Sequence, residues 1–404
     1  MSSFPRIILV FMAVDWPIYT RRPLLYALAE AAAAVDSTVV AVNRPLCPVS
    51  TLIRKPHRVG ELIGKPRLTR LAERLYVYSP RYVIHDRVAG STGPLAELNL
   101  IALRRSYAHL QSRLDIDEPA PLVWFNYPQQ GYVTRLFKDS FRVFELYDNL
   151  VDFMGRESAK VIRTEEQVRR HTDLLLTTSQ KLHDKYTPHY KRSFLLGNGL
   201  SRRTFERLSS ATGEGRSEIM AIPSPRIGYA GVISQRLDWG LITRLAELEP
   251  TWNFIFVGRV SSRRLLRVRD SHSNVWFPGE VAPDDIPAVL RSFDVGIMPY
   301  LDNVFFQYSN PLKFYEMAAA GVASVSSNME ELRKFPPSLV KVLTNDPDLW
   351  QIAIRFFLDA DRQAAVRIGR DLTRRFIWED MAADLLARMR SFIEVPEPRS
   401  GPLL

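Results

Sequence analysis

The 404-residue sequence contains one cysteine, Cys47, so no internal disulfide can form and a reducing compartment is indicated. Seven scattered histidines and one thiol give no ligand spacing for a structural metal, and we expect no metal site. No apolar run approaches the roughly 20 residues that a membrane-spanning helix needs. The short apolar run 7–12 is followed by Asp15, so we expect no secretory signal. These absences predict a cytoplasmic protein, with peripheral attachment to the inner face of the membrane as an open alternative.

The charge is unbalanced: 54 lysines and arginines face 44 acidic residues, which gives a net charge of +10. Such an excess attracts polyanions. Basic residues are dense between positions 54 and 87, and leucine and isoleucine side chains are interleaved with them up to position 75. A solvated loop and helix surface explains this pattern as well as a patch that contacts an anionic membrane does. No nucleic-acid-binding motif accompanies the charge, so nucleic acid is not an expected partner.

Short apolar runs alternate with amphipathic helical patterns along the sequence, which predicts parallel strands joined by crossover helices. We expect two facing, doubly wound, Rossmann-like α/β domains, with a ligand cleft between the carboxyl ends of their strands. The strands expected in the first half are 6–12, 38–42, 75–78, 122–125, 143–147, 174–177 and 193–196. Those expected in the second half are 227–230, 253–257, 275–278, 295–299, 323–326 and 340–343.

A composition break over residues 208–225, rich in serine, glycine and proline, predicts a linker between the two domains. The first domain is then expected over residues 1–207 and the second over 226–375. The last segment, 376–404, contains an amphipathic helical pattern. This helix is expected either to cross back to the first domain or to cap the second.

The most informative segment runs from position 293 to 327. A buried strand is followed by a polar loop, and a helix is expected to begin at Pro311 with Asn310 as its N-cap. Lys313 lies in the first turn, where the unpaired backbone amides already carry partial positive charge. A lysine in this turn is expected if an anion binds there, with Glu316 one turn further accepting hydrogen bonds from ribose hydroxyls. An internal Lys313–Glu316 pair on an exposed face explains the pattern equally well.

The heptapeptide NPLKFYE, from Asn310 to Glu316, resembles the sugar-nucleotide site of group 1 bacterial glycosyltransferases of the GT-B fold. The resemblance continues at family-like intervals through YDNLVDF, DLLLTTS, RIGYAGVI and DVGIMPY. It implies that the second domain binds a nucleotide-sugar donor and the first domain an acceptor. The donor-binding residues that it implies are Gly231, Arg236, Tyr308, Ser309, Asn310, Pro311, Leu312, Lys313 and Glu316.

Two positions depart from the family pattern. Tyr308 stands eight residues before Glu316, where many relatives have a glutamate that contacts the donor sugar. Asp238 stands near the place where many have a second diphosphate-binding cation. We therefore expect Lys313 and Arg236, with the helix amides, to stabilise the departing diphosphate. No divalent metal or other cofactor is then required.

The resemblance implies transfer of a hexose from a nucleotide sugar to a glycan or lipid-linked acceptor in surface polysaccharide biosynthesis, with retention of anomeric configuration. Asp148, just past a strand end of the first domain, is the candidate catalytic carboxylate, and a helix N-cap is its alternative role. Arg21 or Arg22 could bind a phosphate, and plain packing is equally weighted. A non-catalytic GT-B subunit and a nucleotide-sugar epimerase are the alternative functions.

Overall fold

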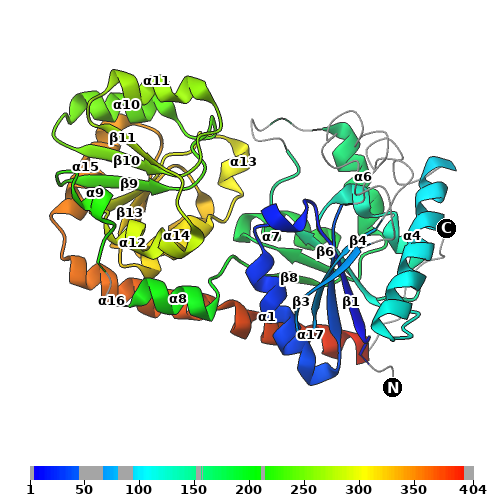
Figure 1. The fold of residues 1–404 in the computed structure, drawn as a ribbon. Coiled ribbons are helices and arrows are strands. Elements are labelled where there is room, and N and C mark those ends of the chain that lie inside the picture. Colours follow the sequence, from blue (N-terminus) through cyan, green and yellow to red (C-terminus); the bar gives the residue numbers. More distant parts are fainter. Residues whose placement is uncertain are drawn as a thin grey trace.

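The computed structural model describes residues 4–44, 67–80, 94–151, 156, 158–210 and 214–394. Two α/β domains lie side by side, the first at the right of Figure 1 and the second at the left. In this part of the chain, no helix combines the length and the apolar composition needed to cross a bilayer. Most of the basic, leucine-interleaved segment 54–87 lies outside the described residues, so its predicted membrane contact stays a prediction.

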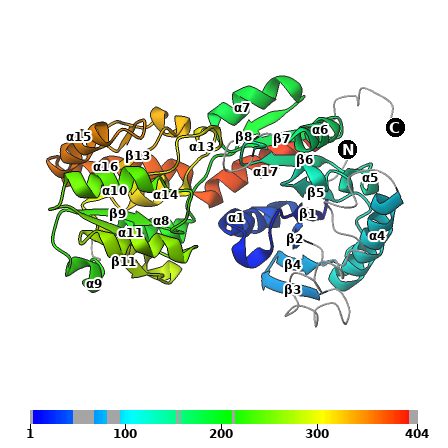
Figure 2. The same ribbon diagram turned by 90° about the horizontal axis from the view of Figure 1, so that it is seen from above.

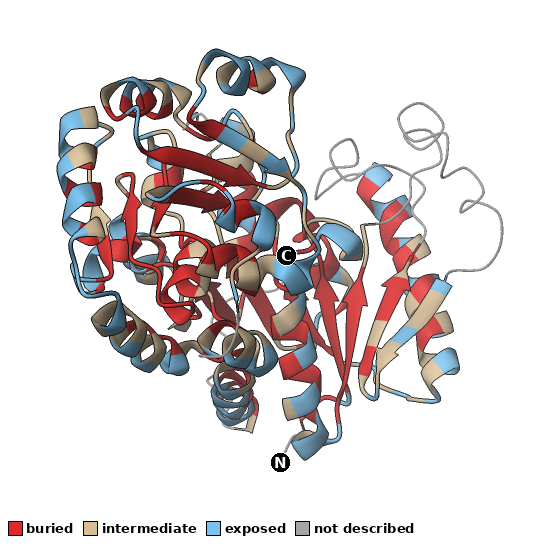
Figure 3. Ribbon diagram, turned by 60° about the vertical axis from the view of Figure 1, so that its left-hand side comes forward, coloured by how far each residue is buried: buried red, intermediate tan, exposed pale blue. Residues whose placement is uncertain are grey.

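The first sheet has eight strands within the described residues, in the order β3-β4-β2-β1-β5-β6-β7-β8. Every neighbouring pair is parallel except β3 and β4, which are antiparallel. The central strands are buried on both faces, as a parallel sheet between two helical layers requires (Figure 3). The strands are β1 (Ile7–Phe11), β2 (Thr38–Val42), β3 (Arg67–Ala72), β4 (Leu75–Ser79), β5 (Leu122–Phe125), β6 (Arg142–Leu146), β7 (Leu174–Thr177) and β8 (Ser193–Leu195).

The second sheet has the order β11-β10-β9-β12-β13-β14 in the described chain, and all its pairs are parallel. Chain order reverses between β9 and β12, so their carboxyl ends form the switch point at which open α/β sheets bind ligands. In the first sheet the reversal falls between β1 and β5. The strands are β9 (Arg226–Ala230), β10 (Asn253–Val257), β11 (Val275–Gly279), β12 (Val295–Met298), β13 (Ser324–Ser326) and β14 (Val340–Val342).

Helices cover both faces of each sheet and close four apolar clusters. In the first domain α1 and α17 pack on one face, and α4, α5 and α7 on the other. In the second domain α10 and α15 cover one face, and α12 and α14 the other. The helices are α1 (Arg22–Ala32), α4 (Pro94–Leu114), α5 (Val133–Leu136), α6 (Ala159–Arg169), α7 (Gln180–Tyr186), α8 (Arg202–Ser209), α9 (Ser217–Met220), α10 (Trp239–Leu248), α11 (Leu266–Ser271), α12 (Ile286–Arg291), α13 (Val304–Gln307), α14 (Leu312–Ala319), α15 (Pro347–Leu358), α16 (Arg362–Thr373) and α17 (Trp378–Glu394).

The chain passes between the domains at two adjacent places. Leu200 and Ile377 form a parallel bridge, and the Leu200 backbone exchanges hydrogen bonds of 2.8 and 2.9 Å with Phe376 and Trp378. After this crossing, α17 runs beneath the first domain and packs along α1 (Figures 1 and 2). Trp378 is only 2% exposed there, because the apolar stripe of α17 completes the core of the first domain.

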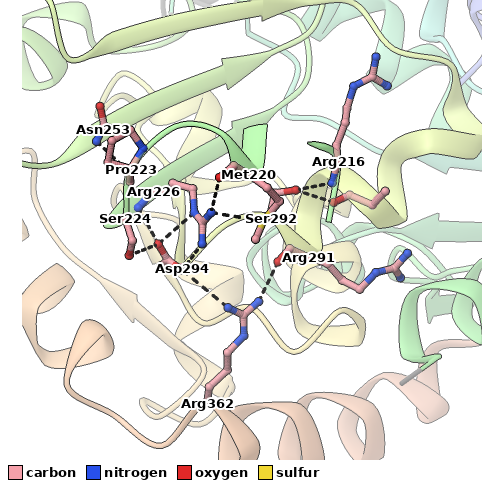
Figure 4. A network of polar contacts seen from close by, with 11 residues as sticks. Arg216, Met220, Pro223, Ser224, Arg226, Asn253, Arg291, Ser292, Asp294 and Arg362 are labelled. Carbon is pink, nitrogen blue, oxygen red and sulfur yellow. Dashed lines mark hydrogen bonds and ion pairs between the residues drawn. The ribbon is translucent and has the colours of Figure 1, made fainter. Parts of the chain in front are cut away.

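A polar network ties the segment before β9 to the amino-terminal edge of the second sheet, at the opposite end of the strands from the switch point (Figure 4). Asp294 accepts hydrogen bonds from the Ser224 hydroxyl at 2.8 Å and from the Arg226 backbone amide at 2.7 Å. The Arg226 guanidinium is within 3.3 Å of the same carboxylate. Burial favours the protonated form, but these hydrogen bonds outweigh it and lower the pKa of Asp294 below its usual range.

The expected doubly wound fold class is confirmed, and each predicted strand is present with its ends shifted by no more than two residues. Several shorter elements among the described residues were not predicted, and two of them fall in segments that were assigned differently. Strand β3 is a charged edge strand without apolar alternation, and its residues were assigned to the basic segment. Helix α9 lies inside the predicted linker 208–225, where its buried Ile219 packs on the second domain.

A candidate donor and acceptor cleft

The carboxyl end of β9 makes a tight backbone crossing at the switch point of the second sheet. Gly231 follows β9 with φ of 153°, and Gly258 follows β10 with φ of 142°, values that favour glycine. A Cβ atom on Gly258 would lie 2.1 Å from the Gly231 carbonyl oxygen. The two glycines therefore allow two backbone turns to come into contact at the carboxyl ends of β9 and β10.

Lys313 reaches this turn from the first turn of α14. A Cβ atom on Gly231 would lie 2.4 Å from both Cε and Nζ of Lys313, so the ammonium group sits directly over the glycine. Its Nζ is also 5.4 Å from the centre of the Tyr229 ring. The cation, the glycine turn and the amino end of α14 thus converge at the switch point, which is the arrangement that binds a phosphate group.

Glu316 lies one turn further along α14 and is half-buried. Burial raises the pKa of Glu316, and the positive charge of Lys313 acts in the opposite direction. Lys313 and Glu316 lie one turn apart on α14, and in the described part of the chain no hydrogen bond or ion pair joins them. The alternative of an exposed, mutually paired Lys313–Glu316 surface does not describe this geometry.

The predicted N-cap at Asn310 is wrong. Helix α14 begins at Leu312 with Pro311 in the cap position, and no side chain caps it. The Asn310 side chain instead points to the first domain, where its amide nitrogen donates a 2.7 Å hydrogen bond to the Thr178 carbonyl. At its other end the helix stops as expected, because Gly321 has φ of 73° just past the last turn.

Arg236 lies on the exposed loop between β9 and α10, with its guanidinium 5.9 Å from the Phe305 ring. Its positive charge also acts on Asp148, across the cleft in the first domain. Asp238, two residues later, caps α10 by accepting a 3.1 Å hydrogen bond from the Leu241 amide. Asp238, which departs from the family pattern, therefore has a structural role as the cap of α10. Arg236 is the cation of this loop that faces the cleft.

Asp148 follows β6 and lines a cavity of about 680 Å³ in the first domain. The cavity lies at the carboxyl ends of β1, β5 and β6, and Phe305 of the second domain contributes to its wall. Burial raises the pKa of Asp148 to about 7, and the charges of Arg236 and Arg21 act to lower it. No helix cap involving Asp148 is seen among the described residues. Its carboxyl group can therefore exchange a proton near neutral pH.

Arg21, the other candidate phosphate ligand, is committed to the interior. Its Nε is 2.7 Å from a carboxylate oxygen of Glu145, and both side chains are at least 95% buried. Arg21 also donates a 3.1 Å hydrogen bond to Asn198 and stacks 4.9 Å from the Trp378 ring. The carboxylate of Glu145 accepts a further hydrogen bond from the Trp124 indole at 2.9 Å. Packing, rather than ligand binding, explains these residues.

The loop that precedes α14 touches the first domain as well as the predicted donor site. The Tyr308 carbonyl accepts a 2.7 Å hydrogen bond from the Ser179 hydroxyl, and the Tyr308 ring lies 4.8 Å from the ammonium of Lys181. Ser309 bonds within its own loop, to the Phe305 carbonyl. The Asn310 carbonyl accepts a 2.6 Å hydrogen bond from the Asn198 side chain. The side chain that replaces the family glutamate therefore packs against α7.

One buried residue at the contact between the two domains was not identified from the sequence. Glu331 is 3% exposed and accepts a 2.7 Å hydrogen bond from the Gln180 amide, at the beginning of α7. It also forms an ion pair with Lys334. In the sequence Glu331 is one of two adjacent glutamates in a polar stretch, and nothing in that pattern distinguishes it from a surface residue.

Comparisons with known proteins concern the fold and the second domain. Residues 224–359 match the model of the family described as Glycosyl transferases group 1. TuaH of Bacillus subtilis (strain 168), a glycosyltransferase provisionally assigned to teichuronic acid biosynthesis, is 27% identical over 257 residues. That match covers 56% of this chain and 62% of the length of TuaH.

Solved structures match over almost the whole chain. Sucrose-phosphate synthase from Thermosynechococcus elongatus superimposes with a TM-score of 0.70 at 15% identity, covering 96% of this chain and all of the other. HepE from Anabaena, in complex with UDP and glucose, gives 0.64 at 14% identity and covers 95% and 99% of the two chains. The chain adopts the GT-B fold, and residues 224–359, within its second domain, match the model of the group 1 glycosyltransferases. The resemblance seen in the sequence is confirmed.

Proposed function

We propose that the protein transfers a hexose from a nucleotide sugar to a glycan or lipid-linked acceptor in surface polysaccharide biosynthesis. The observation that carries this proposal is the position of Lys313 directly over Gly231, at the switch point of the second sheet. The provisional assignment of the relative TuaH to teichuronic acid biosynthesis supports the choice of a polysaccharide pathway.

The second domain is proposed to hold the donor. Lys313, Arg236 and the amino end of α14 surround the place where a diphosphate would lie, and Glu316 would accept hydrogen bonds from the ribose. Negative charge develops on the diphosphate as its bond to the anomeric carbon breaks. Fixed cations and helix amides aimed at that charge lower the barrier, and for this reason we propose that no divalent metal takes part.

The first domain is proposed to hold the acceptor in the cavity beside Asp148. An acceptor hydroxyl forms the new bond to the anomeric carbon, and its proton passes to the Asp148 carboxylate. The raised pKa of Asp148 makes it a stronger base than an ordinary aspartate at neutral pH. We further propose retention of anomeric configuration, which a product analysis by NMR would test.

The sharpest test is a thermal-shift and titration series with nucleoside diphosphates, UDP first. We expect one of them to stabilise the wild-type protein, and Lys313→Ala and Glu316→Ala each to weaken its binding at least about tenfold. Gly231→Ala should weaken binding too, because its methyl group would displace the Lys313 ammonium. In the double variant with Lys313→Ala that methyl group should add little. Lys341→Ala, on β14 outside this site, is the matched control.

Binding that is unaffected by all three substitutions would refute the assignment of the donor site. A non-catalytic subunit is the second candidate, and the packing of Tyr308 against the first domain favours it, because the usual sugar-contacting glutamate is absent. Tight diphosphate binding without hydrolysis or transfer of any labelled nucleotide sugar would support that candidate. The epimerase alternative predicts conversion of the donor sugar without any acceptor.

A further inference from the structure

A second hollow, of about 600 Å³, lies on the first domain between α4, α5 and the end of α6. We refer to it as the basic hollow. Five of its lining residues are lysine or arginine, and Glu97 is the one acidic residue among those that line it. The cations are Arg104, Arg135, Lys138, Arg142 and Arg170.

Carboxylates neutralise only part of this charge. Arg135 forms an ion pair with Glu97, and Arg142 is 3.0 Å from Asp173, which lies behind the hollow. Arg104 and Arg170 add two positive charges to the hollow beyond these two ion pairs. The half-buried His171 lines the same hollow. Burial lowers the pKa of His171, and the positive charges of Arg142 and Arg170 lower it further. The basic hollow is therefore suited to an anion.

The chain beside the basic hollow is apolar and exposed. On α4 the side chains of Leu95, Leu98 and Ile101 are 42%, 44% and 48% exposed, although they lie on a helix whose opposite side is buried. Ile101 itself lines the hollow, and the exposed Arg104 follows it by one turn. At this three-residue spacing Leu98 and Ile101 lie near the middle of the exposed side of α4, and Leu95 and Arg104 lie at its two edges. The exposed side of α4 therefore combines apolar and basic side chains, a combination that suits contact with an anionic membrane.

The basic hollow lies away from the second domain and from the Asp148 cavity. In Figures 1 and 2, α4 lies on the side of the first domain that faces away from the second domain. None of the residues that line the basic hollow also lines the Asp148 cavity. A surface that binds to this face would not obstruct the donor and acceptor cleft.

We propose that this face docks on an anionic bilayer, with lipid phosphate groups in the basic hollow and Leu95, Leu98 and Ile101 in the interfacial layer. The attraction is electrostatic, because basic side chains are drawn to the negative surface potential of anionic lipids. The apolar side chains add contact area and fix the orientation of the helix. This docking depends on the described residues of α4 and the basic hollow, and it does not require the proposed transferase chemistry.

Vesicle flotation of the full chain tests the proposal, with vesicles of phosphatidylcholine alone and of phosphatidylcholine mixed with phosphatidylglycerol. We expect binding to the mixed vesicles only, and weaker binding at high salt. Arg104→Gln combined with Arg170→Gln should weaken it about 30-fold, at about 1 kcal/mol for each charge. Leu98→Ser combined with Ile101→Ser should weaken it as well. The matched controls lie on the second domain: Arg244→Gln with Arg367→Gln, and Leu349→Ser with Ile352→Ser, all four at exposed positions.

Thermal unfolding must show that every variant is folded, and diphosphate binding should be the same in all of them. Loss of vesicle binding in the two α4 variants, with the controls unchanged, supports the proposal. Equal binding by wild type and both α4 variants would overturn it. Binding of inorganic phosphate without binding of anionic vesicles would also overturn it, because the hollow would then be a site for a soluble anion. Preference for single-stranded RNA over vesicles would overturn it in favour of a nucleic-acid partner.

Discussion

At the scale of single residues, the carboxyl group of Asp148 shows how burial moves a pKa toward neutral pH at the expense of stability. Removal from water disfavours its charged form and raises its pKa to about 7. The folded protein therefore holds this proton more tightly than the unfolded chain does, in which an aspartate has a pKa of about 4. It follows that the free energy of unfolding falls as the pH rises from about 4 to about 7.

We predict opposite effects of Asp148→Asn on stability and activity. The variant should be more stable than wild type above pH 7, by up to about 4 kcal/mol, and equal to it below pH 4. Transfer by the wild type should increase as the pH rises through about 7, and the variant should lose most of its activity. Denaturant unfolding across the pH range, together with initial rates, measures both. A wild-type rate that is flat between pH 6 and pH 8 would argue against a proton transfer to Asp148.

Arg21 and Arg236 show that two residues of the same type differ in their availability to a ligand according to their surroundings. Arg21 and Arg236 both lie in loops after first strands, and in the sequence both are candidate phosphate ligands. Arg21 is enclosed by Glu145 and the Trp378 ring, which leaves no face for a ligand. Arg236 stays exposed at the cleft, where its charge reaches Asp148.

At the scale of elements, the Asp294 network attaches β9 and the segment before it to β12. The pKa of the Asp294 carboxyl group is lowered in the folded protein. The ionised carboxylate therefore stabilises the fold at any pH above the pKa of about 4 that an aspartate has in the unfolded chain. That contribution is lost as the pH falls from about 4 through the lowered folded pKa. Because the network lies at the opposite edge of the sheet from the cleft, its contribution concerns stability and not binding (Figure 4).

We predict that Asp294→Ala lowers the free energy of unfolding by about 2–3 kcal/mol at pH 7, because the largely buried Arg226 guanidinium loses its counter-charge. Urea unfolding followed at a series of pH values would measure this difference. The gap between variant and wild type should shrink below pH 4. Asp270→Ala, which removes an exposed ion pair with Arg269, should change stability by less than about 1 kcal/mol. A pH-independent gap would contradict the lowered pKa.

At the scale of the whole molecule, the domains are held together from two sides. On one side the paired crossing segments and α17 join them covalently and through the core of the first domain. On the other side the loop that precedes α14 bonds to Thr178 and Ser179, just before α7, and to Asn198, just after β8. The second contact is polar and small, so it is the one that a domain movement can break.

Asn310→Ala removes a side-chain hydrogen bond that spans the cleft, and we predict that it acts on the arrangement of the domains. The transfer rate should fall about tenfold, the equivalent of one hydrogen bond, while the affinity for the nucleoside diphosphate changes less than about twofold. Small-angle scattering should show a larger radius of gyration. Thr243→Ala is the matched control, because that hydroxyl bonds within its own helix, α10. Diphosphate affinity as low as in Lys313→Ala, with an unchanged radius, would place Asn310 in the donor site instead.

Much of the architecture could be predicted because it is encoded locally. Buried parallel strands such as β1, β5 and β10 are short, continuous apolar runs, and turns rich in glycine and proline bound them. Strand β3 could not be predicted, because its partner β4 supplies the pairing and its own residues are charged and alternate poorly. The convergence of Lys313 and Glu316 at one helix end also followed from their spacing.

The sequence by itself determined the doubly wound fold, the resemblance of the second domain to group 1 glycosyltransferases and the helix that carries Lys313, because each depends on neighbours in the chain. Tertiary structure alone decided what Arg21, Asn310, Tyr308 and Glu331 do. Each of these four residues contacts a partner that lies more than 100 residues away in the sequence. Local sequence patterns indicate which side of a helix or strand is apolar and will be buried. Which polar group it meets across a domain boundary depends on how the two sheets are placed, and that placement is set by packing over the whole chain.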